Sequence, residues 1–129
     1  MSAFWRSRIA SFRYAFQGWF HVLRTQHNAW IHSVIATAVF MVGLWVGLPP
    51  RDWAVIILTI AMVFAAEFMN TAIEAVVDLA SPDKHPLAKI GKDVGAAAVL
   101  VAALAAVLVG LLILGPPLWS KLLTLLSVH

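Results

Sequence analysis

The 129-residue sequence contains no cysteine, and only 12% of its residues are charged. The absence of cysteine excludes disulfide frameworks, thiol catalysis and zinc sites built on cysteine ligands. The basic residues form no run and no nucleic-acid-binding motif, so we expect no nucleic-acid partner despite the net charge of +3. The phosphate-binding motif G-x-x-x-x-G-K-[ST] is also missing, which excludes a nucleotide site of the P-loop type.

The composition is that of a membrane protein. Hydrophobic residues make up 62% of the chain, and the mean hydropathy of +0.90 is far above that of soluble domains. Residues 29–48, 53–80 and 88–114 are long and apolar enough for spanning helices, which need about 20 residues. We therefore predict an all-α integral membrane protein with one domain over residues 1–129. Residues 116–128 are expected to form an interfacial tail.

The N-terminal stretch, residues 4–27, is predicted to form an amphipathic helix on the membrane surface. Its arginines interrupt any apolar core of a cleaved signal peptide, so we expect the stretch to remain in the mature protein. The helix could be a simple anchor or a lid over a neighbouring site, and the sequence leaves both open. Its polar and apolar faces are formed, respectively, by Arg6, Arg13, Gln17, His21 and Arg24, and by Trp5, Ile9, Phe12, Phe16, Trp19 and Leu23.

The basic residues orient the predicted spans. Seven of them precede the first span or lie between the second and third, whereas only Arg51 and Lys121 fall on the opposite side. Because basic loops stay in the cytoplasm, the N-terminus and the loop around residues 81–86 are predicted to be cytoplasmic. The chain is thus expected to be a multi-pass protein whose acidic segment faces the compartment that contains ATP.

Four of the six acidic residues lie within the second and third spans. A charged side chain there costs about 2.5–3.5 kcal/mol even on lenient scales, so such a cluster indicates a functional site. Helical spacing places the acids of the second span on one stripe with Asn70 and Thr71, and the start of the third span forms a second stripe. If the stripes face each other, their charges share one pocket at the inner surface. The charged residues of the stripes are Glu67, Glu74, Asp78, Lys89, Lys92 and Asp93.

This pocket suits phosphoryl transfer. Magnesium is held by one or two carboxylates and completes its shell from phosphates and water, and the lysines suit phosphate oxygens. Glu67 lies about two turns deeper, where it could act as general base toward a lipid hydroxyl at the membrane surface. A metal, lysines and a base suffice, because this reaction depends mostly on positioning and on charge neutralisation.

Structural interpretations compete with this one. Asn70 and Thr71 could hydrogen-bond between helices, and the acids other than Glu67 could form ion pairs with the lysines that fix helix register. His32 is interpreted as an interfacial residue with no ligand. Glu67 has no cationic neighbour in the sequence and is the hardest to explain structurally. A functional alternative is an ion- or proton-coupled membrane subunit that uses the buried carboxylates as a relay, although broken helices and paired half-repeats are absent.

Two motifs closely resemble the signature of the prokaryotic diacylglycerol kinase family, and the resemblance covers nearly the whole chain. The motifs are Glu67-Phe-Met-Asn-Thr-Ala-Ile-Glu-Ala-Val-Val-Asp78 and Ser81-Pro-Asp-Lys-His-Pro-Leu-Ala-Lys-Ile-Gly-Lys-Asp93. The resemblance implies a homotrimeric lipid kinase of the bacterial inner membrane that uses Mg²⁺ and ATP, with active sites shared between subunits. The lipid would be diacylglycerol or undecaprenol. Both lipids present a primary hydroxyl, and the motifs look somewhat more like those of the undecaprenol kinases.

The resemblance also assigns roles to individual residues. Glu67 would be the catalytic base supported by Asn70, Glu74 the metal ligand, and Arg13, Glu67 and Asp78 would contact the lipid. The family often has a second metal-binding glutamate at the position of Gln26, whose amide oxygen brings no charge and would hold a metal more weakly. The residues expected around ATP are Tyr14, Gln26, Glu74, Asp83, Lys84, His85, Lys92 and Asp93.

Overall fold

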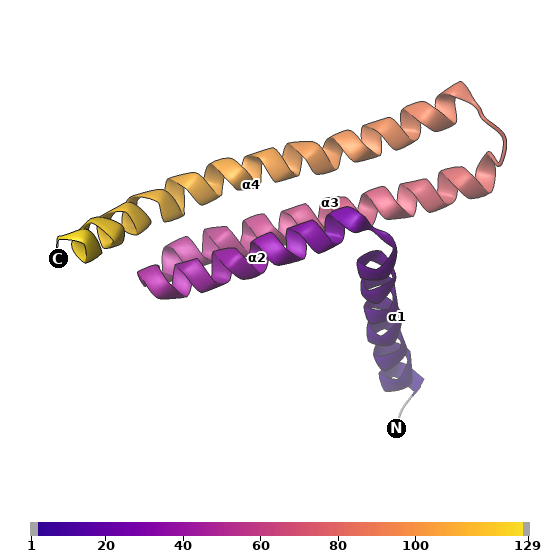
Figure 1. Ribbon diagram of the computed structural model, residues 1–129. Helices are drawn as coiled ribbons and strands as arrows, with labels where there is room; N and C mark the ends of the chain where they lie inside the picture. The colour runs from indigo at the N-terminus through magenta and orange to yellow at the C-terminus, as the bar shows by residue number, and fades with distance from the viewer. Residues whose placement is uncertain (1–2, 128–129) are drawn as a thin grey trace.

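The computed structural model describes residues 3–127, and all of its regular structure in that range is helical. Figure 1 shows the four helices, α1 (Ala3–Thr25), α2 (His27–Val46), α3 (Pro50–Ala80) and α4 (Pro86–Leu126). The last three are long and apolar enough to cross a membrane, which confirms the predicted three-span, all-α class. Large apolar side chains such as Leu58 and Leu112 are 68% and 76% exposed, as expected of lipid-facing surfaces.

A short turn reverses the chain between α2 and α3. Gly47 ends α2 with a positive φ of 79°, a conformation that costs glycine little because it has no Cβ. The amide groups of Gly47 and Leu48 both donate to the carbonyl oxygen of Gly43, at 3.0 and 3.1 Å. Pro50 then begins α3 at a position where its missing N–H costs no hydrogen bond. The two helices therefore run antiparallel, with the turn at the end away from the loop between α3 and α4 (Figure 1).

The helix pair α3 and α4 packs more extensively than any other pair. The loop between them, residues 81–85, ends at His85, whose Nδ1 accepts a hydrogen bond of 3.2 Å from the amide of Leu87. This cap and Pro86 in the first turn start α4. In Figure 1 the hairpin of α3 and α4 projects past the junction of α1 and α2, so the loop stands clear of the other helices.

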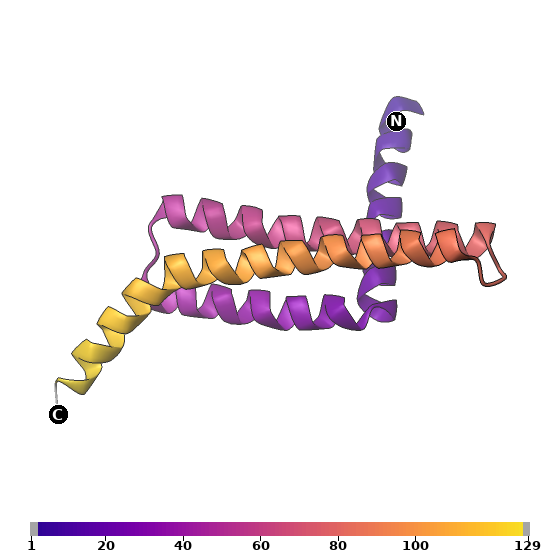
Figure 2. The same cartoon turned by 90° about the horizontal axis from the view of Figure 1, so that it is seen from above.

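The helix that carries the third span continues past residue 114, the predicted end of that span. α4 runs through Pro116 and Pro117 to Leu126, so most of the stretch expected to form an interfacial tail is helical and continuous with the span. Figure 2 shows that it bends away from the bundle in this last part, as prolines inside a helix cause. Lys121 contacts the α2 end here, because its ammonium group donates to the carbonyl oxygen of Trp45. Residue 128 lies outside the described residues.

Helix α1 leaves the bundle at a steep angle (Figures 1 and 2). Phe12 and Phe16 on its predicted apolar face are 68% and 63% exposed, so that face is available to a membrane. Trp19 connects α1 to α3, since its ring lies 5.7 Å from that of Phe64 and 4.9 Å from that of Phe68. The side chain of Arg6 lies outside the described ones, but the helix itself follows the predicted stretch closely.

Candidate active site

Glu67 is the most deeply buried large side chain of the described chain, at 1% exposure. It lies in the middle of α3, where the hydroxyl of Thr71 donates to its backbone carbonyl at 2.9 Å. Its carboxylate oxygen Oε1 lies 3.1 Å from Nε2 of His32 on α2. The two atoms are close enough for an ion pair, although the ring is not aligned for a hydrogen bond, and Oε1 has none among residues 3–127.

This contact gives His32 a partner that its interpretation as an interfacial residue with no ligand did not include. The residue is only 17% exposed in its side chain and lies directly against the buried acid. The sequence did not reveal the contact because it joins residues 35 positions apart on two helices whose register depends on the Gly47 turn. The one feature of the sequence that could have indicated such a contact is that His32 lies in a span with no formally charged residue.

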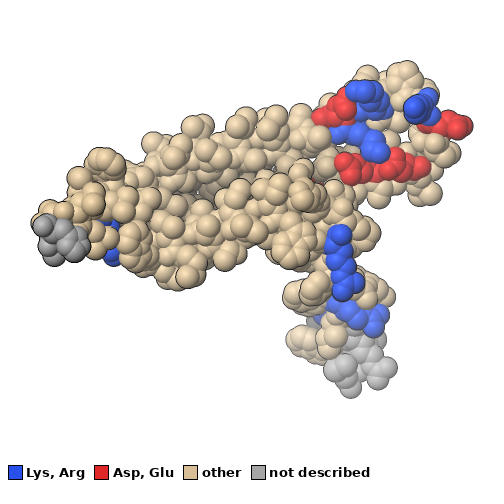
Figure 3. Space-filling view, in the orientation of Figure 1, with Lys and Arg blue, Asp and Glu red and all other residues tan. Residues whose placement is uncertain are grey.

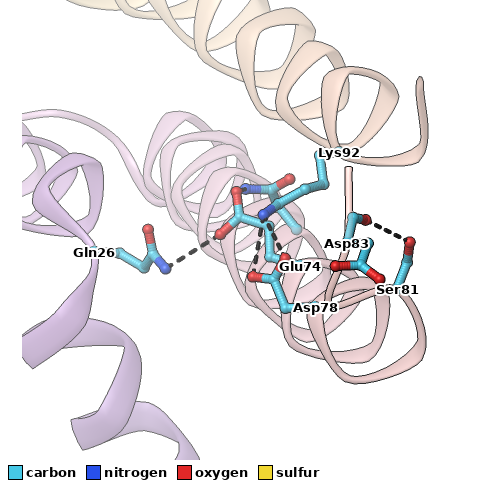
Figure 4. Close-up of polar contacts among 7 residues, drawn as sticks. Gln26, Glu74, Asp78, Ser81, Asp83 and Lys92 are labelled. Carbon is cyan, nitrogen blue, oxygen red and sulfur yellow. Dashed lines mark hydrogen bonds and ion pairs between the residues drawn. The ribbon is translucent and has the colours of Figure 1, made fainter. Parts of the chain in front are cut away.

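A polar cluster surrounds Glu74, two turns along α3 from Glu67. One carboxylate oxygen of Glu74 accepts a hydrogen bond of 3.1 Å from the amide of Asn70. The other lies 3.5 Å from the amide nitrogen of Gln26, at the junction of α1 and α2 (Figure 4). The structure thus brings together three of the predicted site residues from two separate parts of the chain.

Helix α4 closes this cluster through Gly95. The glycine is buried against Asn70, and a Cβ built on it would overlap the amide oxygen of that side chain and lie 3.5 Å from its Cγ. The same oxygen, Oδ1, is buried without a hydrogen-bond partner in the described residues. Asn70 can therefore occupy the position from which it donates to Glu74 only because residue 95 is a glycine, which has no Cβ.

Charged residues form a rim beyond Glu74, at the end of the α3–α4 hairpin (Figure 3). The ammonium group of Lys92 donates to both carboxylate oxygens of Asp78, at 2.8 and 3.1 Å, and so joins α4 to α3. Lys89 pairs with Asp93 one turn away on α4. The two polar stripes therefore face each other here, a condition that the helical spacing of each stripe left open. The Lys92–Asp78 pair is also an ion pair between the two helices, as the structural interpretation allowed.

The rim opens into a pocket of about 770 Å³ between the helix ends and the connecting loop. Asp83, Lys84 and His85 line it together with the paired charges, so the loop residues expected around a nucleotide do meet there. The hydroxyl of Ser81 donates to the backbone carbonyl of Asp83 at 3.0 Å and tightens the loop (Figure 4). His85 has a structural role as well, because its side chain caps α4.

Two predicted residues lie apart from both this pocket and the Glu74 cluster, which itself does not line the pocket. Arg13 and Tyr14 are exposed on α1, where the guanidinium carbon of Arg13 lies 5.3 Å from the centre of the Tyr14 ring. They contact each other rather than the acidic residues, and neither lines the pocket of the rim. Their predicted contacts with nucleotide or lipid remain predictions.

A metal ion at the Glu74 cluster would have one carboxylate and would take its other ligands from amides, water and phosphate oxygens. Residues 3–127 contain no group of three or more His, Asp or Glu side chains placed to hold a metal together. The Glu74 cluster has one carboxylate and two amides instead. This set suits Mg²⁺, which takes one or two carboxylates and fills the remaining positions with water and phosphate oxygens.

An apolar groove of about 370 Å³ runs between α2, α3 and α4. His32 lies at the end of the groove nearest Glu67, and the groove extends along the helices as far as Leu118. The lining is almost entirely aliphatic and aromatic, with Thr59 as a further polar member. Its hydroxyl donates to its own helix, to the carbonyl of Val55 at 2.8 Å.

The chain is similar in sequence to several known proteins over most of its length. Residues 13–114 match the prokaryotic diacylglycerol kinase family. The chain is 45% identical over 113 residues to a diacylglycerol kinase of Synechocystis, with 87% of this chain and 65% of that protein covered. It is 43% identical over 108 residues to the undecaprenol kinase of Bacillus subtilis, with 84% and 88% covered.

A more distant relative is the diacylglycerol kinase of Escherichia coli K12, 31% identical over 99 residues, with 71% of this chain and 78% of that protein covered. The chain thus spans just under two thirds of the Synechocystis protein but most of the other two. The matched residues include α2, α3, the connecting loop and most of α4, with all the acids of the site. The chain therefore belongs to the prokaryotic diacylglycerol kinase family, a family of membrane lipid kinases.

Proposed function

We propose that the protein transfers the γ-phosphate of ATP to the primary hydroxyl of diacylglycerol or undecaprenol. The observation that carries the proposal is the order of side chains along α3. Glu67 is buried, Glu74 with its amides lies about 10 Å nearer the loop, and the charged rim lies beyond. A lipid hydroxyl reaching Glu67 and a phosphate at the rim would meet between them.

In the proposed step Glu67 takes the proton of the lipid hydroxyl. The hydroxyl oxygen forms a bond to the γ-phosphorus of ATP, and the bond from that phosphorus to the oxygen bridging to ADP breaks. The products are a phosphorylated lipid, ADP and a protonated Glu67, which returns its proton to water. Lys92 and Lys89 at the rim would offset the charge of the phosphates, which is the main requirement of this reaction.

Glu74 and Gln26 would hold Mg²⁺, which supplies neutralising charge to the phosphate oxygens when bound. Asn70 would position Glu74 through their 3.1 Å hydrogen bond. Gln26 turns its amide nitrogen toward Glu74, and rotation by half a turn about its last bond would present the oxygen in the same place. The cluster can therefore accept a hard cation without movement of the backbone.

The same geometry supports a placement of the chain in the membrane. Glu74 contacts Gln26, which lies at the junction of the surface helix α1 with α2. We therefore propose that Glu74 lies at the membrane surface and that Glu67 lies inside the membrane. The rim and loop would then stand in the cytoplasm, in agreement with the bias of basic residues. We further propose that the chain acts as a homotrimer in the inner membrane, which the mass of the purified protein–detergent particle would test.

Purified protein reconstituted in phosphatidylcholine vesicles tests the function. With ATP and Mg²⁺, vesicles that contain diacylglycerol or undecaprenol should yield phosphorylated lipid, and Glu67→Gln should reduce kcat by at least about a thousandfold. Asp52→Asn is the matched control, since Asp52 lies on α3 but at its opposite end. Absence of product with both lipids, or an active Glu67→Gln variant, contradicts the proposal.

The same vesicles separate the lipid kinase from the ion- or proton-coupled alternative. A relay through Glu67 and Glu74 would move protons across the vesicle membrane in the absence of any lipid substrate, and a pH-sensitive dye inside the vesicles would record it. The lipid kinase predicts no lipid-independent proton movement. Running the two lipids side by side then identifies the preferred substrate.

A further inference from the structure

We infer that His32 is a positioning residue for the carboxylate of Glu67. The inference rests on the proposed function, in which Glu67 is the general base. Nε2 of His32 lies 3.1 Å from Oε1 of Glu67, across the interface of α2 and α3. Glu67 is 1% exposed, so water has almost no access to fix the orientation of its carboxylate.

The neighbouring polar side chains are engaged elsewhere. Asn70 donates its amide to Glu74, and the hydroxyl of Thr71 donates to the backbone carbonyl of Glu67 rather than to its carboxylate. Within residues 3–127, His32 is the side chain that approaches the Glu67 carboxylate within ion-pair distance. A buried carboxylate oxygen that lacks a hydrogen bond is costly, and a small rotation of the His32 ring would supply one.

The position of His32 makes the interaction useful for the reaction. It lies where the apolar groove between the helices ends beside Glu67. A donor on Oε1 would hold the carboxylate so that Oε2 is left to take the proton of the lipid hydroxyl. A general base must lie within hydrogen-bond reach of the proton that it abstracts, so a carboxylate that rotates freely would spend less time in the reactive orientation.

Two substitutions of His32 separate the effect of its N–H donor from the effect of its side-chain volume. His32→Gln keeps an N–H donor close to the position of Nε2, whereas His32→Leu keeps the volume but removes the donor. We expect His32→Leu to lower kcat by about 10- to 100-fold, the equivalent of one hydrogen bond to a charged group, with the KM for ATP unchanged. His32→Gln should recover most of that loss.

Thr59→Ala is the matched control. Thr59 lines the same groove but bonds only to its own helix, so kcat should stay within about twofold of the wild type. Thermal unfolding of each variant in detergent checks that the protein is folded. A wild-type kcat in His32→Leu overturns the inference, and so does an equal loss in folded His32→Leu and His32→Gln.

A measurement without turnover separates this inference from the proposed function. The ¹⁵N resonances of the His32 ring, recorded in selectively labelled full-length protein in detergent, should move on Glu67→Gln and stay in place on Asp52→Asn. If Glu67→Gln remains active while the ring resonances move, the proposed base is wrong but the contact is real. If Glu67→Gln is inactive and His32→Leu is as active as the wild type, the function stands and His32 has no positioning role.

Discussion

The side chain of Asn70 on α3 lies against the backbone of Gly95 on α4, with no room for a Cβ between them. This close approach lets the Asn70 amide reach Glu74 at 3.1 Å, so a residue without a side chain on one helix determines the placement of an acid on the other. The arrangement links helix packing directly to the proposed metal site.

Substitution of Gly95 by alanine should therefore damage activity more than stability. The new methyl group would displace the Asn70 amide and loosen Glu74, while alanine itself favours the helix by about 1 kcal/mol. We expect kcat to fall by about tenfold or more with little change in the midpoint of thermal unfolding. Gly91→Ala is the matched control, because its Cβ would meet only Val77 at an ordinary 3.7 Å. Equal activity of the two variants would contradict the positioning role of Asn70.

Gln26→Glu should strengthen the proposed metal site. A second carboxylate beside Glu74 would lower the Mg²⁺ concentration for half-maximal activity about fivefold, the equivalent of about 1 kcal/mol of added attraction. Without metal the same change places two like charges together, so the midpoint of thermal unfolding should fall on chelation and recover with Mg²⁺. Gln26→Leu should raise the Mg²⁺ requirement instead. An unchanged Mg²⁺ dependence in both variants would place the metal elsewhere.

Reversal of the Lys92–Asp78 pair separates its structural role from its proposed role in binding ATP. The double variant Lys92→Asp with Asp78→Lys can form the same bridge between α4 and α3, so it should unfold close to the temperature of the wild type. Activity should not return, because the cation has moved away from its place on α4 and an acid replaces it. We expect the KM for ATP to rise by about tenfold or more. Full activity of the double variant would leave the pair with a purely structural role.

The sequence was sufficient for the spans and for the polar stripe of α3, because helical periodicity is local. Offsets of three, four and seven residues place Asn70, Thr71 and Glu74 on the side of Glu67 whatever packs against them. The contact of Lys92 with Asp78 required a further condition, that the two polar stripes face each other. The short loop at residues 81–85 makes α3 and α4 antiparallel neighbours, but the rotation of each helix about its axis depends on packing.

The contact of His32 with Glu67 could not be predicted in the same way. It depends on the register of α2 against α3, which the Gly47 turn and the packing of the helices set together. The continuation of α4 through Pro116 and Pro117 was likewise missed, because adjacent prolines normally end a helix. Here the helix continues through both prolines but bends away from the bundle, and Lys121 makes one contact with the end of α2.

Trp19→Ala should detach α1 from α3 without unfolding the bundle. Trp19 stacks on Phe64 and meets Phe68 edge to face, and each such pair contributes about 0.5–1.5 kcal/mol beyond its buried area. Because Gln26 directly follows α1, a loosened α1 should also free Gln26 from Glu74, so the Mg²⁺ requirement should rise along with the rate of proteolysis within residues 3–25.

Phe20→Ala is the control, since Phe20 is 57% exposed and makes no ring contact among the described residues. If Trp19→Ala speeds proteolysis but leaves the Mg²⁺ requirement unchanged, α1 is an anchor alone; if both change, the surface helix helps to build the metal site.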